Sequence, residues 1–305
     1  MNNLYPKTQI DFEETFSTEE KCQDRLMALK WPERFVCPKC SGDQFRLKTR
    51  HRIVCRLCCH ETSLLCDTLF TNTNKSLREW FHALWWIAAQ KNGISAVGFQ
   101  RIMGLGCYET AWSWLHKLRA AMHRTGQNKL NGVVEVDETF IGGVHAGKAG
   151  RGAAGKVLVV VAAEKRGRKI GRLRLAVIPN AETFTLEAFA QIYVERGSEI
   201  VTDGWAGYRN LGTLGFRHQV DRSEKVLPKV HLAASLLKRW LLGTHQGRVS
   251  AKYLQCYLNE FVFRFNRRTA KSRGLLFESL LELCASGQGL TNEEISSQHE
   301  PLPVV

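Results

Sequence analysis

Two aspartates in this chain each follow a short hydrophobic run. Asp137 comes directly after residues 133–136, and Asp203 directly after residues 200–202. Both runs are rich in β-branched side chains, which predicts strands. If these strands share a sheet, their ends bring the two carboxylates together, and such pairs hold Mg²⁺ ions in phosphoryl-transfer sites. Glu135 lies on the same face as Asp137 and is a rival ligand; the alternative for either aspartate is to cap a turn or helix.

Four cysteines form two tight pairs, a pattern typical of a zinc site. Cys37 and Cys40 are the first C-x₂-C pair, and Cys55 and Cys58 follow after fourteen intervening residues. Each pair places two thiolates on one turn, and four thiolates satisfy tetrahedral Zn²⁺, so the sequence predicts a zinc ribbon. Cys59 is an alternative to Cys58, although the spacing favours Cys58. The remaining cysteines are expected to be small buried hydrophobic residues: Cys22, Cys66, Cys107, Cys256 and Cys284.

The composition indicates a polyanionic partner. The 305 residues carry a formal net charge of +14, with a pI near 9.5, and a basic surface attracts phosphates and releases their counterions. No apolar stretch approaches the roughly 20 residues that span a bilayer, and the N-terminus lacks a signal-peptide pattern. The sequence therefore predicts a cytoplasmic nucleic-acid-binding protein with two or three folded units and no membrane segment.

Helical periodicity dominates the first part of the chain. A capping box formed by Ser17 and Glu20 predicts a helix over residues 21–30. A second helix is expected to begin after Ser76 and to end at Gly93.

Two basic segments in this part of the chain are predicted to contact DNA. The hairpin between the cysteine pairs carries cations that can follow a phosphate backbone, namely Arg46, Lys48, Arg50 and Arg52. Past residue 93, two helices meet at a glycine turn, which is typical of a helix-turn-helix, and the later part of the second carries Lys117 and Arg119. The alternatives are a solvated charged face and a plain helical linker.

From residue 133 the periodicity changes to that of strands. Five strands are expected, with a helix over residues 183–195 between the third and fourth, at residues 133–136, 157–163, 173–178, 199–202 and 217–221. This order is that of a ribonuclease-H-like core, an α/β fold. Helices over residues 230–242 and 251–266 follow. The basic glycine-rich loop after the first strand lacks the spacing of a P-loop.

The chain is therefore divided into four predicted segments. They are an N-terminal helix with a zinc ribbon, a helical DNA-binding segment, a ribonuclease-H-like catalytic domain and a C-terminal tail, at residues 1–70, 71–128, 129–270 and 271–305. The tail is polar and contains prolines from Thr291 onward, so disorder is expected there.

These motifs together resemble those of a known family. The chain shares with bacterial insertion-sequence DDE transposases that carry an N-terminal zinc ribbon, the ISXO2-like transposases, the ordered stretches CPKC…CRLC, VEVDETFIGG, VTDGWAGY and VHLAASLLKRWLLGTHQGRVSAKYLQCYLNEFVFRFNRR. The resemblance runs from about Phe16 to Arg268. It implies that Asp137 and Asp203 are the first two residues of the catalytic set.

The third catalytic position departs from the plain DDE pattern. The resemblance places a Glu or another metal-compatible residue seven positions before a lysine, and here these two positions hold His231 and Lys238. A neutral imidazole brings no negative charge, so it should weaken Mg²⁺ binding and relatively favour Mn²⁺. Lys238 and Arg239 would face the phosphates beside the scissile bond.

The resemblance implies a transposase that cuts the ends of an insertion element and joins the freed 3′-hydroxyl to target DNA by two-metal phosphoryl transfer. Its cofactors would be structural Zn²⁺ and catalytic Mg²⁺ or Mn²⁺. Its partners would be double-stranded DNA, as terminal inverted repeats and target, and further copies of itself in a homo-oligomer on DNA. The expected setting is the bacterial cytoplasm, in association with the nucleoid.

Three other functions fit parts of the sequence. A catalytically inactive, transposase-derived DNA-binding protein would keep the ribbon and helices and lose cleavage through His231. A nuclease or RNA–DNA hybrid hydrolase on the same core would cut and never join. A zinc hydrolase is disfavoured, because four thiolates close the coordination and leave no open position.

Overall fold

The described part of the chain folds as two compact units. The computed structural model describes residues 5–48, 51–123, 129–142, 156–223, 226–247, 249–287 and 294. The described residues up to Met122 and from Ala270 onward form the first unit, here called the ribbon unit, and those from His123 to Thr269 form the sheet unit. Apart from Glu294, the predicted tail from Thr291 lies outside the described residues, as does most of the predicted basic loop. None of the helices in these ranges has the length and apolar character to cross a membrane.

A small antiparallel sheet follows the first cysteine pair. Its strands run in the order β1-β2-β3 and are β1 (Phe45–Leu47), β2 (Arg52–Cys55) and β3 (Glu61–Ser63). Ile53 and Val54 at its centre are buried, while most β1 side chains face solvent. The predicted ribbon is therefore confirmed as a three-stranded sheet that carries the cysteine pairs.

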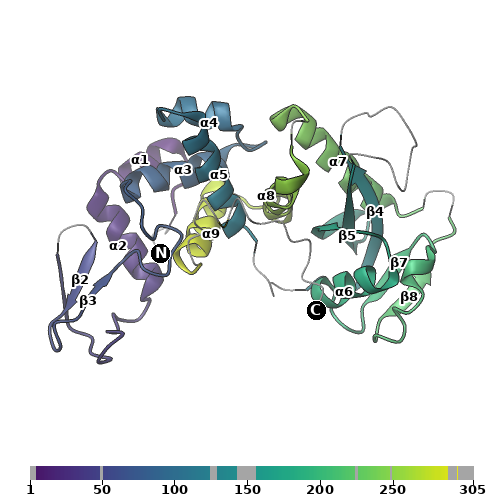
Figure 1. The fold of residues 1–305 in the computed structure, drawn as a ribbon, viewed down its shortest axis with the longest axis horizontal. Coiled ribbons are helices and arrows are strands. Elements are labelled where there is room, and N and C mark those ends of the chain that lie inside the picture. Colours follow the sequence, from purple (N-terminus) through teal and green to yellow (C-terminus); the bar gives the residue numbers. More distant parts are fainter. Residues whose placement is uncertain are drawn as a thin grey trace. The chain divides into compact units, whose positions relative to one another are not determined.

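Helices make up the rest of the ribbon unit (Figure 1): α1 (Gln9–Thr15), α2 (Glu19–Lys30), α3 (Leu77–Ala89), α4 (Ala96–Met103), α5 (Tyr108–Ala121) and α9 (Arg273–Ala285). The prediction for α2 was wrong at its start, because Thr18 rather than Ser17 accepts the Lys21 amide. Ser76 caps α3 as predicted, with a reciprocal bond to Glu79. However, α3 ends at Ala89, four residues before the predicted end.

Aromatic side chains hold the ribbon unit together. Phe12 stacks on Trp85 with ring centroids 4.9 Å apart, and Phe277 meets Phe12 edge-on at 5.5 Å. Phe277 is fully buried and lies on α9, far along the chain from its partners. Burying a side chain of this size contributes about 2–3 kcal/mol. The C-terminal helix is thus an integral part of the ribbon unit.

A five-stranded mixed sheet forms the centre of the sheet unit. Its strands run in the order β6-β5-β4-β7-β8 and are β4 (Val133–Ile141), β5 (Val157–Arg166), β6 (Lys169–Ile178), β7 (Glu199–Thr202) and β8 (Arg217–Val220). The first three strands pair antiparallel, and β7 and β8 add in parallel. All five predicted strands are present. The first was predicted too short, so Asp137 lies within β4 and not at its end.

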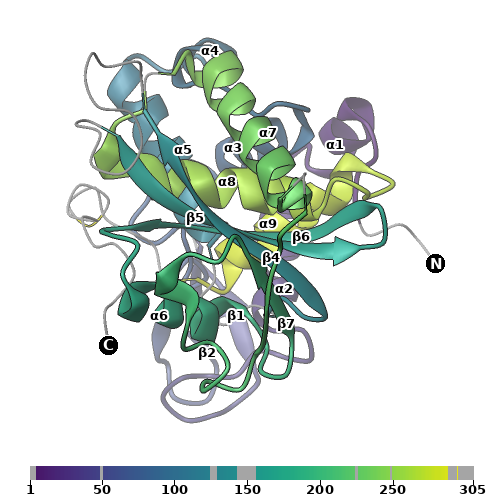
Figure 2. The same ribbon diagram turned by 90° about the vertical axis from the view of Figure 1, so that its right-hand side faces the viewer.

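Helices cover both faces of this sheet. The helices α7 (Pro228–His245) and α8 (Leu254–Asn266), with the short 3₁₀ turn η2 (Ala251–Tyr253), pack on one face. The helix α6 (Thr183–Tyr193) and the turn η1 (Ala206–Tyr208) cover the other, as Figure 2 shows. Along β5, alternate side chains enter the two cores, because the side-chain period of a strand is two.

A buried ion pair fixes the turn between β5 and β6. The Glu164 carboxylate is almost fully buried and accepts from the Arg172 guanidinium and from the backbone amides of Asn131 and Arg172. Burial raises the pKa of Glu164, but these donors outweigh burial and leave the pKa below its usual value. A Cβ at Gly171 would come within 2.8 Å of the Glu164 side chain, so glycine gives this pair its room.

We expect Glu164→Ala to lower the free energy of unfolding by about 3 kcal/mol, because it leaves the Arg172 guanidinium without its buried partner. Because the folded pKa is depressed, the difference from wild type should be present above about pH 4.3 and shrink as pH falls below it. Denaturant titrations across pH measure this. Glu195→Ala, which removes an exposed carboxylate of the same unit, is the control, and equal losses in the two variants would contradict the assignment.

Candidate functional site

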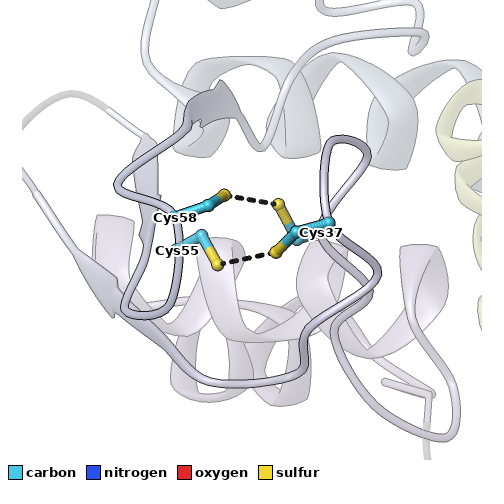
Figure 3. A group of neighbouring side chains, drawn as sticks. Cys37, Cys55 and Cys58 are labelled. Atoms are coloured by element: carbon cyan, nitrogen blue, oxygen red, sulfur yellow. Dashed lines mark hydrogen bonds between the residues drawn. The ribbon is translucent and has the colours of Figure 1, made fainter.

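Four thiols converge at the base of the ribbon sheet. The Sγ atoms of Cys37, Cys40, Cys55 and Cys58 all lie within 4.8 Å of one another. Two of the separations are 3.7 Å, from Cys37 to Cys58, and 3.6 Å, from Cys40 to Cys55 (Figure 3). A tetrahedron with Zn–S bonds of about 2.3 Å has sulfur–sulfur edges of about 3.8 Å. The four thiols therefore fit a structural zinc ion as they stand.

The two cysteine pairs form matching backbone turns. The residue after each pair, Ser41 or Cys59, has a left-handed conformation, with φ of 58° and 55°. The amide of each donates to the carbonyl of the first cysteine of its pair, at 2.9 and 3.1 Å. Cys59 therefore occupies the turn position that Ser41 occupies in the first pair. This equivalence favours Cys58 over Cys59 as the fourth ligand.

We expect Cys58→Ser to lose bound zinc and Cys59→Ser to retain it. A serine hydroxyl is a poor replacement for thiolate, and zinc binding is coupled to folding of such ribbons. Metal content of the purified variants, read by atomic emission against protein concentration, checks this. Loss of zinc from Cys59→Ser with retention in Cys58→Ser would exchange the two roles.

A second group of polar side chains gathers on the α7 face of the large sheet. The strands β4 and β7 pair in parallel, with Glu135 opposite Val201. Continuing this register by two residues places Asp137 beside Asp203, on strands about 4.8 Å apart. The two aspartates are close enough that Asp203 raises the pKa of Asp137. Strand pairing thus brings together two acids that are far apart in the sequence.

The backbone around Asp203 is a tight turn. Gly204 has a φ of +86°, a conformation that suits glycine. The Trp205 amide donates to Asp203 Oδ1 at 2.9 Å, and the Trp205 indole donates to the Ala181 carbonyl at 3.0 Å. Asp203 therefore caps a turn, as the alternative interpretation expected. The bond from the Trp205 amide also fixes the orientation of the Asp203 carboxylate.

The start of α7 brings a histidine to Asp137. His231 Nε2 lies 3.2 Å from Asp137 Oδ2, and 60% of the His231 side chain is exposed. Burial is the largest influence on Asp137 and raises its pKa; Asp203 raises it further, while the Glu138 amide and His231 lower it. The net pKa is raised, so the folded protein holds this carboxylate at a cost that a bound cation would offset.

Lys238 joins the same group two turns along α7. It lines an open hollow of about 370 Å³ together with Asp137, Glu138, Thr139, Val230, His231, Ala234 and Ser235. Seven residues correspond to nearly two complete turns, so Lys238 and His231 share a face of the helix. Arg239 is exposed on α7 but does not line the hollow.

Glu135 is bonded to the start of α7 and does not face solvent. Its carboxylate is buried, and Oε2 accepts the amides of Lys229 and Val230, at 2.7 and 3.2 Å. These amides belong to the first turn of α7, whose donors have no partner within the helix. Glu138 points to the opposite face, where the Tyr208 hydroxyl donates to it. Glu135 and Glu138 thus lie on opposite faces of the sheet, as the side-chain alternation of a strand requires.

We expect Glu135→Ala to lower the free energy of unfolding by about 1–3 kcal/mol, since it leaves two amides of α7 without an acceptor. Glu135→Gln keeps a carbonyl acceptor and should cost less. Denaturant unfolding measures both, and calorimetric titration with Mn²⁺ tests the rival role. If Glu135 were a metal ligand, Glu135→Gln would abolish Mn²⁺ binding without affecting stability.

The predicted DNA-binding side chains differ in their availability. Arg46 is exposed, whereas Lys48 and Arg52, also exposed, pair with Glu61 at 2.6 and 3.1 Å. Arg50 lies outside the described residues. The ribbon hairpin therefore offers cations in the predicted place, two of them already engaged with a carboxylate.

On α5 the prediction needs a correction. Arg119 is only 1% exposed and faces the helix packing of the ribbon unit, so its guanidinium does not present itself to DNA. Lys117 is half-buried, and burial lowers its pKa. Counting from helical periodicity alone would have placed Arg119 near the buried stripe that contains Leu115 and Leu118.

Comparisons with known proteins match both of these regions of the chain to transposase domains. Residues 129–266 match the model of the ISXO2-like transposase domain, and residues 17–61 match the transposase zinc-ribbon domain. A similar protein is described as an uncharacterized protein in transposable element ISH50 of Halobacterium salinarum. It is 25% identical over 285 residues, which cover 82% of this chain and 92% of the relative. The two domain matches together span more than half of the chain, which thus carries an ISXO2-like transposase domain behind an N-terminal transposase zinc ribbon.

Proposed function

We propose that this protein cuts the ends of a DNA element and joins the freed 3′-hydroxyl to target DNA. The observation that carries the proposal is the convergence of Asp137, Asp203 and His231 on one face of the large sheet. The order and pairing of the five strands, β6-β5-β4-β7-β8, support a ribonuclease-H-like core. We keep residues 129–270 as the proposed catalytic segment, whereas the segment predicted as a tail from residue 271 contains α9, which belongs to the ribbon unit.

The donor set suits a hard divalent cation. Two carboxylates and an imidazole would hold the metal, and the mutual repulsion of Asp137 and Asp203 is relieved by positive charge. When bound, Mg²⁺ or Mn²⁺ supplies an activated oxygen nucleophile and stabilises the leaving oxygen. Because His231 adds no negative charge, we expect Mn²⁺ to support activity better than Mg²⁺.

The protein side chains have separate tasks in this proposal. Asp137 and Asp203 would hold the cation that positions the scissile phosphate. Lys238 reaches the adjoining phosphate from the same face of α7, where an ammonium group neutralises its charge. Glu135 accepts two amides of the first turn of α7 and thereby keeps His231 next to Asp137.

DNA binding is implied by the transposase family. We assign the grip on element ends to the ribbon hairpin and to α4 and α5, which lie as two helices joined by a short glycine turn. The exposed candidates in the ribbon are Arg46, Lys48 and Arg52, and α7 of the sheet unit adds Arg239. Two element ends must be held together, so we propose a homo-oligomer on DNA. The relative in an archaeon leaves a bacterial origin as a prediction.

A second candidate rests on His231 itself. Its side chain is mostly exposed and carries no fixed negative charge. A protein that had lost cleavage while keeping the ribbon would show this feature too. Such a protein would bind element ends and leave them intact.

The test compares wild type with Asp203→Ala on DNA from both flanks of the gene, with Mg²⁺ or Mn²⁺. We expect metal-dependent 3′-end cutting and strand joining by the wild type, with Mn²⁺ the more effective. Asp203→Ala should lose about 10²–10³-fold in rate, the range seen when a charge-stabilising group is removed, and should still bind the DNA. Glu195→Ala removes an exposed carboxylate of the same unit that lies outside the proposed site and serves as the control.

Strand joining by Asp203→Ala at the wild-type rate would refute the site. Binding without cutting in either metal, on flanks shown to carry matching ends, would favour the inactive DNA-binding protein. Cutting without joining would favour a nuclease. Each result is read on a sequencing gel.

A further inference from the structure

The turn between β5 and β6 is the most concentrated exposed basic feature of the described sheet unit. Four of its five residues are cationic, and all five are exposed: Lys165, Arg166, Gly167, Arg168 and Lys169. Arg166 lies 3.5 Å from Glu164, whose carboxylate is already bonded to Arg172. For Arg168 and Lys169, the ion pairs identified among the described residues include no acidic partner. The turn therefore presents positive charge to solvent.

The turn is held stiffly. Arg166 pairs with Lys169 across the hairpin, and Gly167 has a φ of +57°, which suits a two-residue turn whose twist matches the strands. Directly below it, the buried Glu164 bonds to the Arg172 guanidinium and the Asn131 amide. A stiff support reduces the conformational entropy that its cations would lose on binding a ligand.

The turn is also tied to the catalytic helix. Lys229 Nζ donates to the Arg168 carbonyl at 2.5 Å, while the amide of Lys229 donates to Glu135. His231 follows two residues later and reaches Asp137. The basic turn thus adjoins the end of α7 at which the proposed catalytic group lies.

Cations therefore stand at both ends of this stretch of α7. Lys229 and Lys238 are nine residues apart in sequence, which is about 13.5 Å along a helix. At about 3.4 Å per nucleotide of one strand, this span covers about four phosphates of B-form DNA. Lys238 accounts for one end of the span, and the basic turn lies at the other.

We propose that the β5–β6 turn is a phosphate-binding surface that holds the backbone of double-stranded DNA on the side of the catalytic group away from Lys238. Arg168 and Lys169 make the contacts, and the carbonyl of Arg168 fixes the turn to α7 through Lys229. This inference rests on the proposed function, because it takes the strand at Asp137 to be DNA. It adds contacts outside the ribbon and helical segments.

The experiment measures the salt dependence of DNA affinity without added Mg²⁺ or Mn²⁺. A fluorescent blunt duplex of unrelated sequence is titrated with full-length protein over a series of KCl concentrations. Each lost phosphate contact should lower the slope of log affinity against log salt by about 0.9 in magnitude. We expect a decrease of about 1.8 for Arg168→Gln with Lys169→Gln, and about half of that for each single variant.

The matched control removes two exposed cations elsewhere in the sheet unit, by Arg196→Gln with Arg217→Gln. Its slope should equal that of wild type, and both double variants should unfold at the wild-type denaturant concentration. Equal slope losses in the two double variants would show a general effect of net charge and overturn the proposal. An unchanged slope in the turn variant, or a change with duplex RNA alone, would overturn it as well.

Failure of the proposed function gives a different pattern. If the wild type binds the duplex with the expected slope loss in the turn variant but never cuts DNA, the surface stands and the catalytic assignment falls. If the wild type cuts and joins while the turn variant keeps its slope, the reverse holds.

Discussion

The bond between the Glu135 carboxylate and the first turn of α7 fixes the distance between a strand and a helix. The strand carries Asp137 two residues later, and the helix carries His231 one residue past the second bonded amide. A buried carboxylate that accepts two amides at a helix N-terminus is held by hydrogen bonds and by the helix dipole together. The buried bonds of Glu135 thus determine how Asp137 and His231 are placed relative to each other at the surface of the sheet.

Side-chain alternation along β4 places its acidic residues on different faces of the sheet. Glu135 and Asp137 face α7, whereas Glu138 turns to Tyr208 in the opposite core. Tyr208 is buried, and burial together with Glu138 raises its pKa well above the usual value, so it stays a neutral donor. Three acids within four residues therefore have three different environments: Glu135 is buried against α7, Asp137 faces His231 beside the hollow, and Glu138 accepts from Tyr208.

The sequence predicted the elements that are defined by local pattern. The cysteine spacing predicted the ribbon, Ser76 predicted the start of α3, and short strand-like segments predicted all five strands of the large sheet, although β8 contains only one β-branched residue. It could not reveal that β4 continues past Asp137, because charged side chains within a strand interrupt the pattern that marks it. The burial of Arg119 depends on tertiary packing, which no local rule encodes.

Within the site, spacing and alternation placed Asp137, Asp203 and Glu135 on the sheet. The resemblance suggested His231, and only the fold shows that it lies beside Asp137. The partners of Glu135 could not be predicted, since its bonds are to backbone amides and backbone amides leave no mark in a sequence. The basic turn was visible as a charge run. Its tie to α7 through a carbonyl was not.

The helix α9 gives the chain an order of assembly. Its Phe277 completes an aromatic core whose other members come from the first part of the chain. In the sequence, the whole sheet unit therefore lies between the two segments that form the ribbon unit. During synthesis on the ribosome, the sheet unit emerges complete while the ribbon unit still waits for its last helix. A nascent chain therefore completes its five-stranded sheet before the aromatic core of the ribbon unit, and a prematurely terminated product would expose that incomplete core to cellular proteases.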